Sequence, residues 1–403
     1  MSKETNNKGE VVTMSYTELM EATSKNSVNN KGNNSVVTLE KIGKAFGEDS
    51  SLGILCVSDV PNFVSLRQRL LPLSRQLASL PPEELESVTD EESGYQVGWS
   101  HGREKVEGGK FDVGKGSFYA NPLTDDLLSA IQQRRALHGT EEDVCTEELE
   151  RVAKENPAFF APNVWPTQSI PQLESAVKDM GMLVHTVGCS LAKLCDEYVF
   201  SQCPTYNPTQ IHTVLQHSLC CKARLLHYFP TTQQPPSKGG DDDFSDWCGW
   251  HNDHGSLTGL IPAMYLNAQN QEIPSPDPKA GLYIKSRNGK LTHVSIPSNC
   301  LAFQIGETSQ VHSGGILQAT PHAVRGCRSH GGVEGDVTRE SFAVFMEPEY
   351  HGDMNIPEGK TVQDTQRKDA EQFLPPSVRT LRSRWKYGMN FGEFSDATFA
   401  AFY

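Results

Sequence analysis

The sequence predicts an α+β protein in which helices come first and an antiparallel β body follows. Residues 169–200 place apolar side chains, among them Leu173, Val177 and Met180, on one broad helical stripe. From about residue 222 the pattern changes to short β-rich segments separated by Gly, Pro, Asn and Asp clusters. Strands at this spacing indicate a closed or double-sheet body. The expected segments are residues 223–230, 257–268, 281–286, 292–296, 300–306 and 341–348.

The two ends of the chain differ from the middle. The start is rich in Asn, Ser, Lys and Thr and cannot bury enough apolar surface to offset its ordering entropy, so it is expected to be disordered except for a transient helix over 13–22. The last residues return to a helical pattern, with a helix expected over 367–389. The expected organisation is a disordered tail over 1–36, an N-terminal helical and mixed region over 37–215, a β domain over 216–350 and a C-terminal helical extension over 351–403.

Composition excludes several classes of partner. The 403 residues carry a formal net charge of −14, which repels phosphate backbones, so nucleic acid is not expected to bind. No stretch approaches the roughly 18 apolar residues that span a bilayer, and the first residues lack the apolar run of a secretory signal. The ten cysteines are scattered without a CxxC pair, which favours reduced thiols and a cytoplasmic protein. No feature of the sequence indicates an oligomeric state.

The motif with the clearest chemistry is His251-Asn252-Asp253. In an extended strand, residues two apart point to the same face, so His251 and Asp253 can both face the inside of a β barrel. Two imidazoles and one carboxylate on one face of an iron ion leave open positions for a bidentate co-substrate and O₂. A third ligand must then come from another strand. The downstream histidines that could supply it are His293, His312, His322, His330 and His351.

A second pair of residues suits a carboxylate ligand. Arg339 and Ser341 are two apart in a β-rich segment and therefore share a face. A guanidinium beside a hydroxyl can bind the far carboxylate of a chelating 2-oxo acid, because the fork donates two hydrogen bonds and the hydroxyl one more. Arg325 is a rival, but it does not begin an alternating strand with a serine.

The order HxD, distal His and RxS resembles the isopenicillin N synthase-like branch of the 2-oxoglutarate/iron(II) dioxygenases. Further segments share this resemblance over roughly residues 50 to 350. They are the strand 224–230 that ends near Tyr228, the hairpin 281–290, the segment 303–307 and the Asn163-Val164-Trp165-Pro166 motif before the long helix. The resemblance implies a double-stranded β-helix, a jelly-roll barrel, buttressed by an N-terminal helical region. It also implies that His251, Asp253 and His322 hold iron(II), and that Arg339, Ser341 and Tyr228 bind 2-oxoglutarate.

The activity implied by the resemblance is hydroxylation, desaturation or ring closure of a small organic substrate. Iron(II), 2-oxoglutarate and O₂ would take part, with ascorbate as an additional reductant, and succinate and CO₂ would be formed. Two alternatives stay open. One is an oxidase of the same fold that uses no 2-oxo acid, since the same Arg and Ser can hold a substrate carboxylate. The other is a barrel that binds a small molecule without catalysis.

Other residues receive more ordinary interpretations. His254 would point away from the metal and pack or support the ligands. The acidic run Asp241–Asp246 is interpreted as a solvated loop near the mouth of the pocket. Trp247, Trp250 and Tyr119 are candidates for the substrate pocket, with core packing as the alternative.

Overall fold

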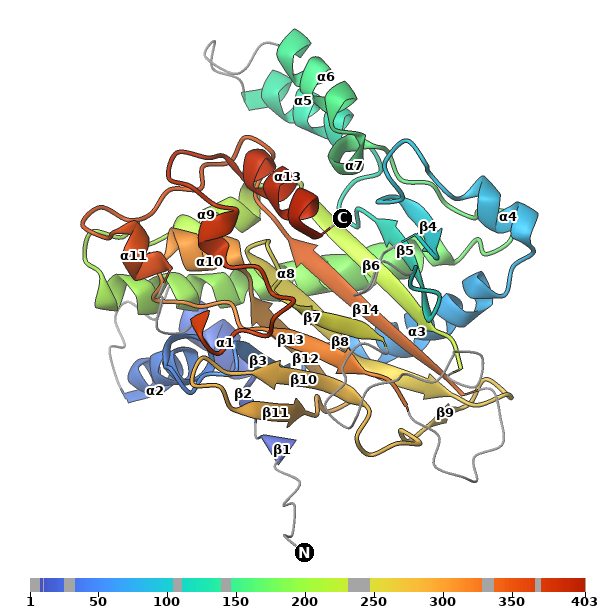
Figure 1. Cartoon of the computed structure of the whole chain (residues 1–403), viewed down its shortest axis with the longest axis horizontal. Helices are drawn as coiled ribbons and strands as arrows, with labels where there is room; N and C mark the ends of the chain where they lie inside the picture. The colour runs from blue at the N-terminus through green and yellow to red at the C-terminus, as the bar shows by residue number, and fades with distance from the viewer. Residues whose placement is uncertain are drawn as a thin grey trace, which may run out of the picture.

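The computed structural model describes residues 8–9, 11–24, 33–103, 111–138, 146–230, 247–327, 337–366 and 371–402. Among the described residues, helices predominate up to His217, and strands predominate from Cys221 to Met346, where they form most of two β-sheets (Figure 1). All six β-rich segments expected from the sequence form strands. No helix in these described ranges combines the length and apolar character needed to cross a membrane.

In the described parts of the chain, the larger sheet has nine strands. Its order is β2 (Val12–Ser15), β3 (Ile54–Ser58), β12 (Cys300–Ile305), β8 (Leu257–Leu266), β14 (Thr338–Met346), β6 (Cys221–Tyr228), β5 (Lys115–Ala120) and β4 (Gly98–His101), with β9 (Glu272–Ile273) beside β8. Apart from the parallel pair β2–β3, its neighbours are antiparallel.

The smaller sheet, counted over the same described residues, has five strands, in the order β1 (Lys8–Gly9), β11 (Leu291–Val294), β10 (Gly281–Lys285), β13 (His322–Arg325) and β7 (Cys248–His251). From β6 onward the chain passes back and forth between the two sheets: β6, β8, β12 and β14 belong to the larger one, and β7, β10, β11 and β13 to the smaller one. Strands that follow one another in the sequence therefore often lie in different sheets, on opposite sides of the interior, instead of pairing within one sheet.

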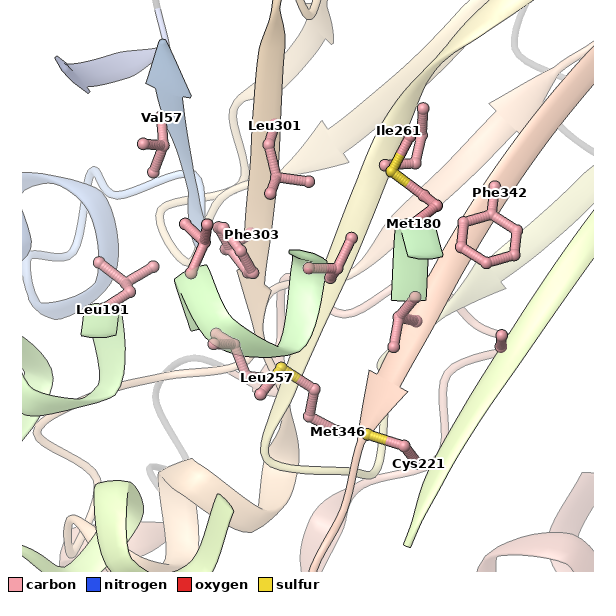
Figure 2. Close-up of a cluster of buried hydrophobic side chains, with 14 of the residues drawn as sticks. Val57, Met180, Leu191, Cys221, Leu257, Ile261, Leu301, Phe303, Phe342 and Met346 are labelled. Carbon is pink, nitrogen blue, oxygen red and sulfur yellow. The ribbon is translucent and has the colours of Figure 1, made fainter. Parts of the chain in front are cut away.

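The main core lies between the larger sheet and the helices that cover its outer face. The central helix α8 (Leu173–Gln202) was expected over 169–200, and its apolar stripe is buried as predicted. Figure 2 shows Met180 and Leu191 of α8 gathered with Phe303 and Phe342 of the sheet. The approach is close enough that a Cβ on Gly259 of β8 would lie 2.1 Å from Val184 of α8. Helix α8 thus packs against one face of the larger sheet. The opposite face of that sheet lines the interior between the two sheets.

Shorter helices complete the fold. They are α1 (Tyr16–Thr23), α2 (Asn33–Ile42) with the π-helical turn Gly43–Gly47, α3 (Phe63–Ala78), α4 (Pro82–Ser87), α5 (Leu127–His138), α6 (Thr146–Glu155), α7 (Pro157–Phe160), α9 (Gln210–His217), α10 (Glu307–His312), α11 (Val362–Thr365), the 3₁₀ turn Leu381–Ser383 and α13 (Phe391–Phe402).

The disordered tail expected over residues 1–36 is wrong where the structure describes it: residues 8–9 form β1, residues 33–36 begin α2, and the longest described stretch is residues 11–24. These residues form β2 and α1, and β2 pairs in parallel with β3. Met14 is 1% exposed and Leu19 is fully buried against the main core. The Ser15 side chain accepts from the Glu18 backbone N–H and caps α1. A few apolar residues at strand and helix spacing are enough to order a polar segment when a sheet edge is available to pair with them.

The helix expected over 367–389 is also wrong where the structure describes it. Residues 372–389 form turns, bends and the 3₁₀ turn Leu381–Ser383. Pro375 and Pro376 lack the backbone N–H that an α-helix needs, which explains the loss of helix there. Trp385 is nonetheless 1% exposed and packs with Met354 and Phe391. The C-terminal segment is therefore fixed by side-chain packing and by the later helix α13.

Candidate metal centre

Two strands of the smaller sheet bring the three predicted metal-binding residues together. His251 is the last residue of β7, and Asp253 follows it in the loop that leads to β8. His322 is the first residue of β13, and it lies directly opposite His251 in the antiparallel pair β13–β7. A register shift just beyond this pair marks a local irregularity next to the site. Two histidines that are far apart in the sequence are thus cross-strand neighbours.

The donor atoms of the triad surround a common point. The Nε2 atoms of His251 and His322 each lie 3.7 Å from Oδ1 of Asp253. One donor atom from each residue can be chosen so that all lie within 4.8 Å of one another. In the described part of the chain, no other group of three His, Cys, Asp or Glu residues meets this criterion.

The hydrogen bonds of the triad fit a metal. Nδ1 of His251 lies 2.8 Å from the Gly249 carbonyl oxygen, and Nδ1 of His322 lies 3.3 Å from that of Thr320. A proton on each Nδ1 satisfies these carbonyls and leaves both Nε2 lone pairs directed toward Asp253. Oδ2 of Asp253 is buried without a hydrogen-bond partner. A divalent cation at this point would satisfy it, so the residues present fit an ion such as iron(II).

Electrostatics keep the carboxylate ionised. Burial alone would raise the pKa of Asp253, but the imidazoles of His322 and His251 outweigh burial and lower it. Burial and the neighbouring His251 lower the pKa of His322 to about 4. Burial would also lower the pKa of His251, but Cys248 and Asp253 outweigh it and raise that pKa to about 9.

The predicted carboxylate-binding residues lie on the interior face of the larger sheet. On β14, Phe342 and Val344 belong to the core against α8, so by alternation Arg339 and Ser341 face the other way. Arg339 and Ser341 are each 8% exposed, and Nη1 of Arg339 lies 3.4 Å from Oγ of Ser341. Tyr228 on β6 is the direct cross-strand partner of Arg339.

Arg339 sits between aromatic rings rather than carboxylates. Its guanidinium carbon lies 4.8 Å from the centre of the Tyr228 ring and 5.6 Å from that of Trp247. Within the described ranges, no Asp or Glu side chain forms an ion pair with Arg339. A buried guanidinium without a carboxylate is costly unless a ligand supplies the anion. Arg339 is therefore suited to bind an anionic group from outside the chain.

The metal triad and the Arg339 site share one interior. Val324 is two residues beyond His322 on the same face of β13 and pairs with Cys248. Val324 also packs against the cluster of Tyr228, Trp247 and Tyr265 that surrounds Arg339. Strand β13 thus contributes one residue to the metal triad and another to the cluster around the Arg339 guanidinium.

Other residues singled out in the sequence are distributed as follows. Arg325, the rival of Arg339, points to the opposite face of β13 and interacts with Tyr283. Trp250 packs on that outer face against Tyr283 and Ala323, away from the metal. Tyr119 lies under the guanidinium of Arg224, 5.0 Å from ring centre to carbon. The acidic run Asp241–Asp246 lies outside the described residues.

Two features of the site were missed by sequence reasoning. Trp247 stacks on Arg339, whereas the sequence suggests the substrate pocket or core packing for it. Glu307 and Arg384 approach the metal loop from distant parts of the chain. Trp247 immediately precedes the metal strand, which is a signal that could have linked it to the anion site. The approach of Arg384 has no local signal.

No protein-family model matches the sequence, and no curated protein matches it either. Solved structures do match over nearly the whole chain. A protein from Caulobacter crescentus assigned to the 2OG-Fe(II) oxygenase family has a TM-score of 0.59 at 16% identity, covering 97% of this chain and 98% of that one. A full-length Neurospora crassa protein, in complex with alpha-KG and thymine, has a TM-score of 0.59 at 17% identity, covering 99% of each chain.

A plant structure agrees with these two. AtDAO1, the dioxygenase for auxin oxidation 1 from Arabidopsis thaliana in complex with 2-oxoglutarate, has a TM-score of 0.52 at 14% identity. The match covers 89% of this chain and 100% of that one. The likeness shows that this chain shares the fold of these three structures. Independently of that likeness, the His-Asp-His group of this chain has the two imidazoles and one carboxylate that can hold a divalent metal ion.

Proposed function

We propose that this protein is an iron(II)- and 2-oxoglutarate-dependent oxygenase that hydroxylates, desaturates or cyclises a small organic substrate. The observation that carries the proposal is the pairing of two sites in one interior. His251, Asp253 and His322 converge on a common point, and the buried Arg339 beside Ser341 lacks an acidic partner in the described chain. A metal triad alone would be compatible with many reactions. The Arg339 and Ser341 site adds a place for a carboxylate, so the two sites together suit a dianion that has one end at the metal.

The strand order supports a jelly-roll barrel for this site. The eight strands β6, β7, β8, β10, β11, β12, β13 and β14 pass between two sheets and leave an interior lined from both. We assign residues 216–350 to this double-stranded β-helix, residues 37–215 to the region that buttresses it and residues 351–403 to a C-terminal extension. The free state of the cysteines in the described chain supports a reducing, cytoplasmic compartment.

Each site residue has a role in this proposal. The two histidines and Asp253 would hold iron(II), with Nδ1 of each imidazole anchored on a backbone carbonyl. Arg339 and Ser341 would bind the distal carboxylate of 2-oxoglutarate, and Tyr228 supports Arg339 through its ring. When bound, iron and 2-oxoglutarate supply the oxidising chemistry with O₂, yielding succinate and CO₂, and ascorbate would keep the iron reduced. The protein orients these groups and excludes water.

The substrate is proposed to be a small molecule. The Neurospora crassa structure contains alpha-KG and the AtDAO1 structure contains 2-oxoglutarate. The Neurospora crassa protein was obtained both with thymine and with 5-formyluracil. The net charge of −14 disfavours a nucleic-acid substrate for this chain. These observations support a free small molecule as the group that enters beside the metal.

The test is anaerobic addition of iron(II) and then 2-oxoglutarate to the metal-free protein. We expect the visible charge-transfer absorption of a chelated 2-oxo acid in the wild type and its loss in His322→Ala. His293→Ala is the matched control, because His293 stacks on Tyr283 in the same sheet but takes no part in the triad.

The result also separates the alternatives. Iron binding without the absorption band, with no succinate formed in air, would replace the proposal by an oxidase of the same fold. Absence of iron binding would leave a barrel that binds small molecules without catalysis. The band and its dependence on His322 together would sustain the proposal.

A further inference from the structure

Glu307 is a buried acid that contacts the metal loop without belonging to it. It is the first residue of α10 and is 1% exposed. Oε1 of its carboxylate accepts a hydrogen bond from Nδ2 of Asn252 at 3.1 Å. Its backbone N–H donates to the carbonyl oxygen of Asp253 at 2.8 Å. Glu307 thus holds the two consecutive residues that follow His251.

The start of α10 holds the rest of the loop in the same way. The backbone N–H and the hydroxyl of Thr308 both donate to the carbonyl oxygen of His254, at 3.2 and 2.6 Å. The N–H of Gly306 and the hydroxyl of Ser309 donate to the carbonyl oxygen of Ser256, at 3.1 and 2.7 Å. Consecutive carbonyls of the metal loop are therefore satisfied by one helical turn, which fixes the backbone from which the Asp253 side chain projects.

Glu307 is in turn held by an arginine of the C-terminal segment. Nη2 of Arg384 lies 2.6 and 2.7 Å from the two carboxylate oxygens of Glu307. The side chains are 2% and 1% exposed, so solvent does not screen this ion pair. Nη1 of Arg384 also donates to the Thr398 hydroxyl at 2.9 Å, which ties the pair to α13. The contact joins residues 77 positions apart in the sequence.

Charge makes this pair relevant to the metal centre. The Glu307 and Asp253 carboxylates are close enough to repel each other, and both are buried. The positive charge of Arg384 compensates the negative charge of Glu307. The negative charge of Asp253 then remains available to a metal ion in the triad. A Glu307 side chain without Arg384 would be an unpaired buried acid and would leave its position or take up a proton. Departure of the side chain removes the acceptor for Asn252, and a proton replaces the charged acceptor by a weaker neutral one.

We propose that Glu307 and Arg384 are positioning residues that set the affinity and geometry of the metal centre through Asn252 and the Asp253 backbone. This inference rests on the proposed function, because it presumes that His251, Asp253 and His322 hold a divalent ion. The C-terminal segment then acts as part of the metal site, although it contributes no ligand. Residues that support metal ligands in this way commonly change metal affinity by about 10- to 100-fold when they are replaced.

The test is titration of the metal-free full-length protein with iron(II) under anaerobic conditions, and with manganese(II) as a redox-stable probe. The variants are Arg384→Gln, Glu307→Gln, the double variant and the milder Arg384→Lys. Arg382→Gln is the matched control, since Arg382 pairs with Glu371 in the same segment, is about half exposed and does not touch the metal loop. The thermal midpoint without metal measures any loss of folding separately.

We expect the dissociation constant to rise by about tenfold or more in Arg384→Gln and Glu307→Gln, with Arg382→Gln unchanged. The charge-transfer absorption with 2-oxoglutarate should also shift, which a purely structural loss would not cause in molecules that remain folded. The Arg384→Gln variant separates the positioning effect of Arg384 on metal binding from the effect of its positive charge. Removing a cation near the site should tighten metal binding if only Coulomb attraction matters, and should weaken it if positioning dominates.

Unchanged or tighter binding in both Arg384→Gln and Arg384→Lys, with the wild type binding metal normally, would overturn this inference and leave the proposed function intact. Absence of metal binding in the wild type would overturn the proposed function itself. Partial recovery of affinity in the double variant relative to the single variants would support the pairing, because it removes both buried charges together.

Discussion

His251 and His322 face each other as direct cross-strand partners of β7 and β13, with ring centres 4.3 Å apart and planes tilted by 58°. Two rings this close would pack against each other in an ordinary core. Here both Nε2 atoms turn toward one buried carboxylate oxygen instead. The shared orientation, rather than proximity alone, distinguishes a ligand pair from a packed pair.

Replacing Asp253 by Asn should abolish stabilisation by metal without harming the metal-free fold. The change removes a buried charge but keeps the shape, and Oδ2 has no hydrogen bond to lose. A ligand at 100 times its dissociation constant stabilises the wild type by about 2.7 kcal/mol, and the variant should gain essentially none. Thermal unfolding with and without manganese(II) measures both quantities. Equal stabilisation of the two proteins would contradict the assignment of Asp253 as a ligand.

Replacing Arg339 by Lys should weaken 2-oxoglutarate binding although the charge is kept. Lys cannot donate the paired hydrogen bonds of a guanidinium or stack flat between Tyr228 and Trp247. We expect the apparent affinity to fall by roughly 10- to 100-fold, or about 1.4–2.7 kcal/mol. Titration of the charge-transfer absorption measures it. Arg325→Lys serves as the comparison, because Arg325 lies on the outer face of β13, and a larger effect there would reverse the assignment.

Gly259→Ala should destabilise the fold by about 1–3 kcal/mol through overpacking. The new Cβ would meet a side-chain methyl carbon of Val184 at 2.1 Å, where α8 crosses the sheet. Denaturant unfolding measures the loss. Gly249→Ala is the control, since a Cβ there has no neighbour within 4 Å. A Val184→Ala change in the same molecule should restore part of the stability, and failure to do so would place the strain elsewhere.

Asp196 should make stability fall as pH rises from about 4 to 7. It accepts hydrogen bonds from the Tyr206 hydroxyl and from the backbone N–H groups of Ile211 and His212, so it caps α9 from α8. Burial nevertheless raises its pKa to about 6. Because this exceeds the unfolded value of about 3.9, the folded state binds more protons in that window, and the associated stability, on the order of 2–3 kcal/mol, is lost as pH rises through the folded pKa.

The variant Asp196→Asn checks this dependence. Its amide group places an NH₂ toward a backbone N–H, so it should be less stable than the wild type. It cannot titrate, however, so the difference between the two proteins should narrow as pH increases. Urea unfolding of the metal-free proteins at several pH values measures this difference. A gap that stays constant with pH would show that Asp196 is ionised throughout.

Local patterns were sufficient to predict much of the site. The two-residue spacing of His251 and Asp253, and of Arg339 and Ser341, predicts that each pair lies together, and each pair does. Strand β14 holds Arg339 and Ser341, whereas Asp253 lies in the loop after β7 rather than in the strand with His251. Alternation also favoured Arg339 over Arg325, which faces outward. The choice of His322 among the downstream histidines needed the family resemblance, because no spacing rule selects one distant histidine over another. His312, for example, is buried, but it bonds the Asp353 carbonyl and does not belong to the triad.

Contacts between distant segments could not be predicted. Nothing in the sequence around Arg384 indicates that it reaches Glu307, since the residues around Arg384 form turns rather than a regular element. The ordered structure of residues 11–24 could not be predicted for a similar reason. Met14 and Leu19 are too few to predict a buried segment by composition, and their segment is ordered by pairing with β3, which follows only after helix α2 in the chain.

That early segment has a consequence for handling the protein. β1 and β2 are the end strands of the two sheets, each pairing in parallel with a strand that would otherwise be last. Residues 8–9 and 12–15 thus cover one edge of each sheet with a short stretch of backbone. A chain shortened past this point would expose the open N–H and C=O groups of β3 and β11 to other molecules. Self-association by strand addition, rather than unfolding, would then be the first failure of the shortened protein.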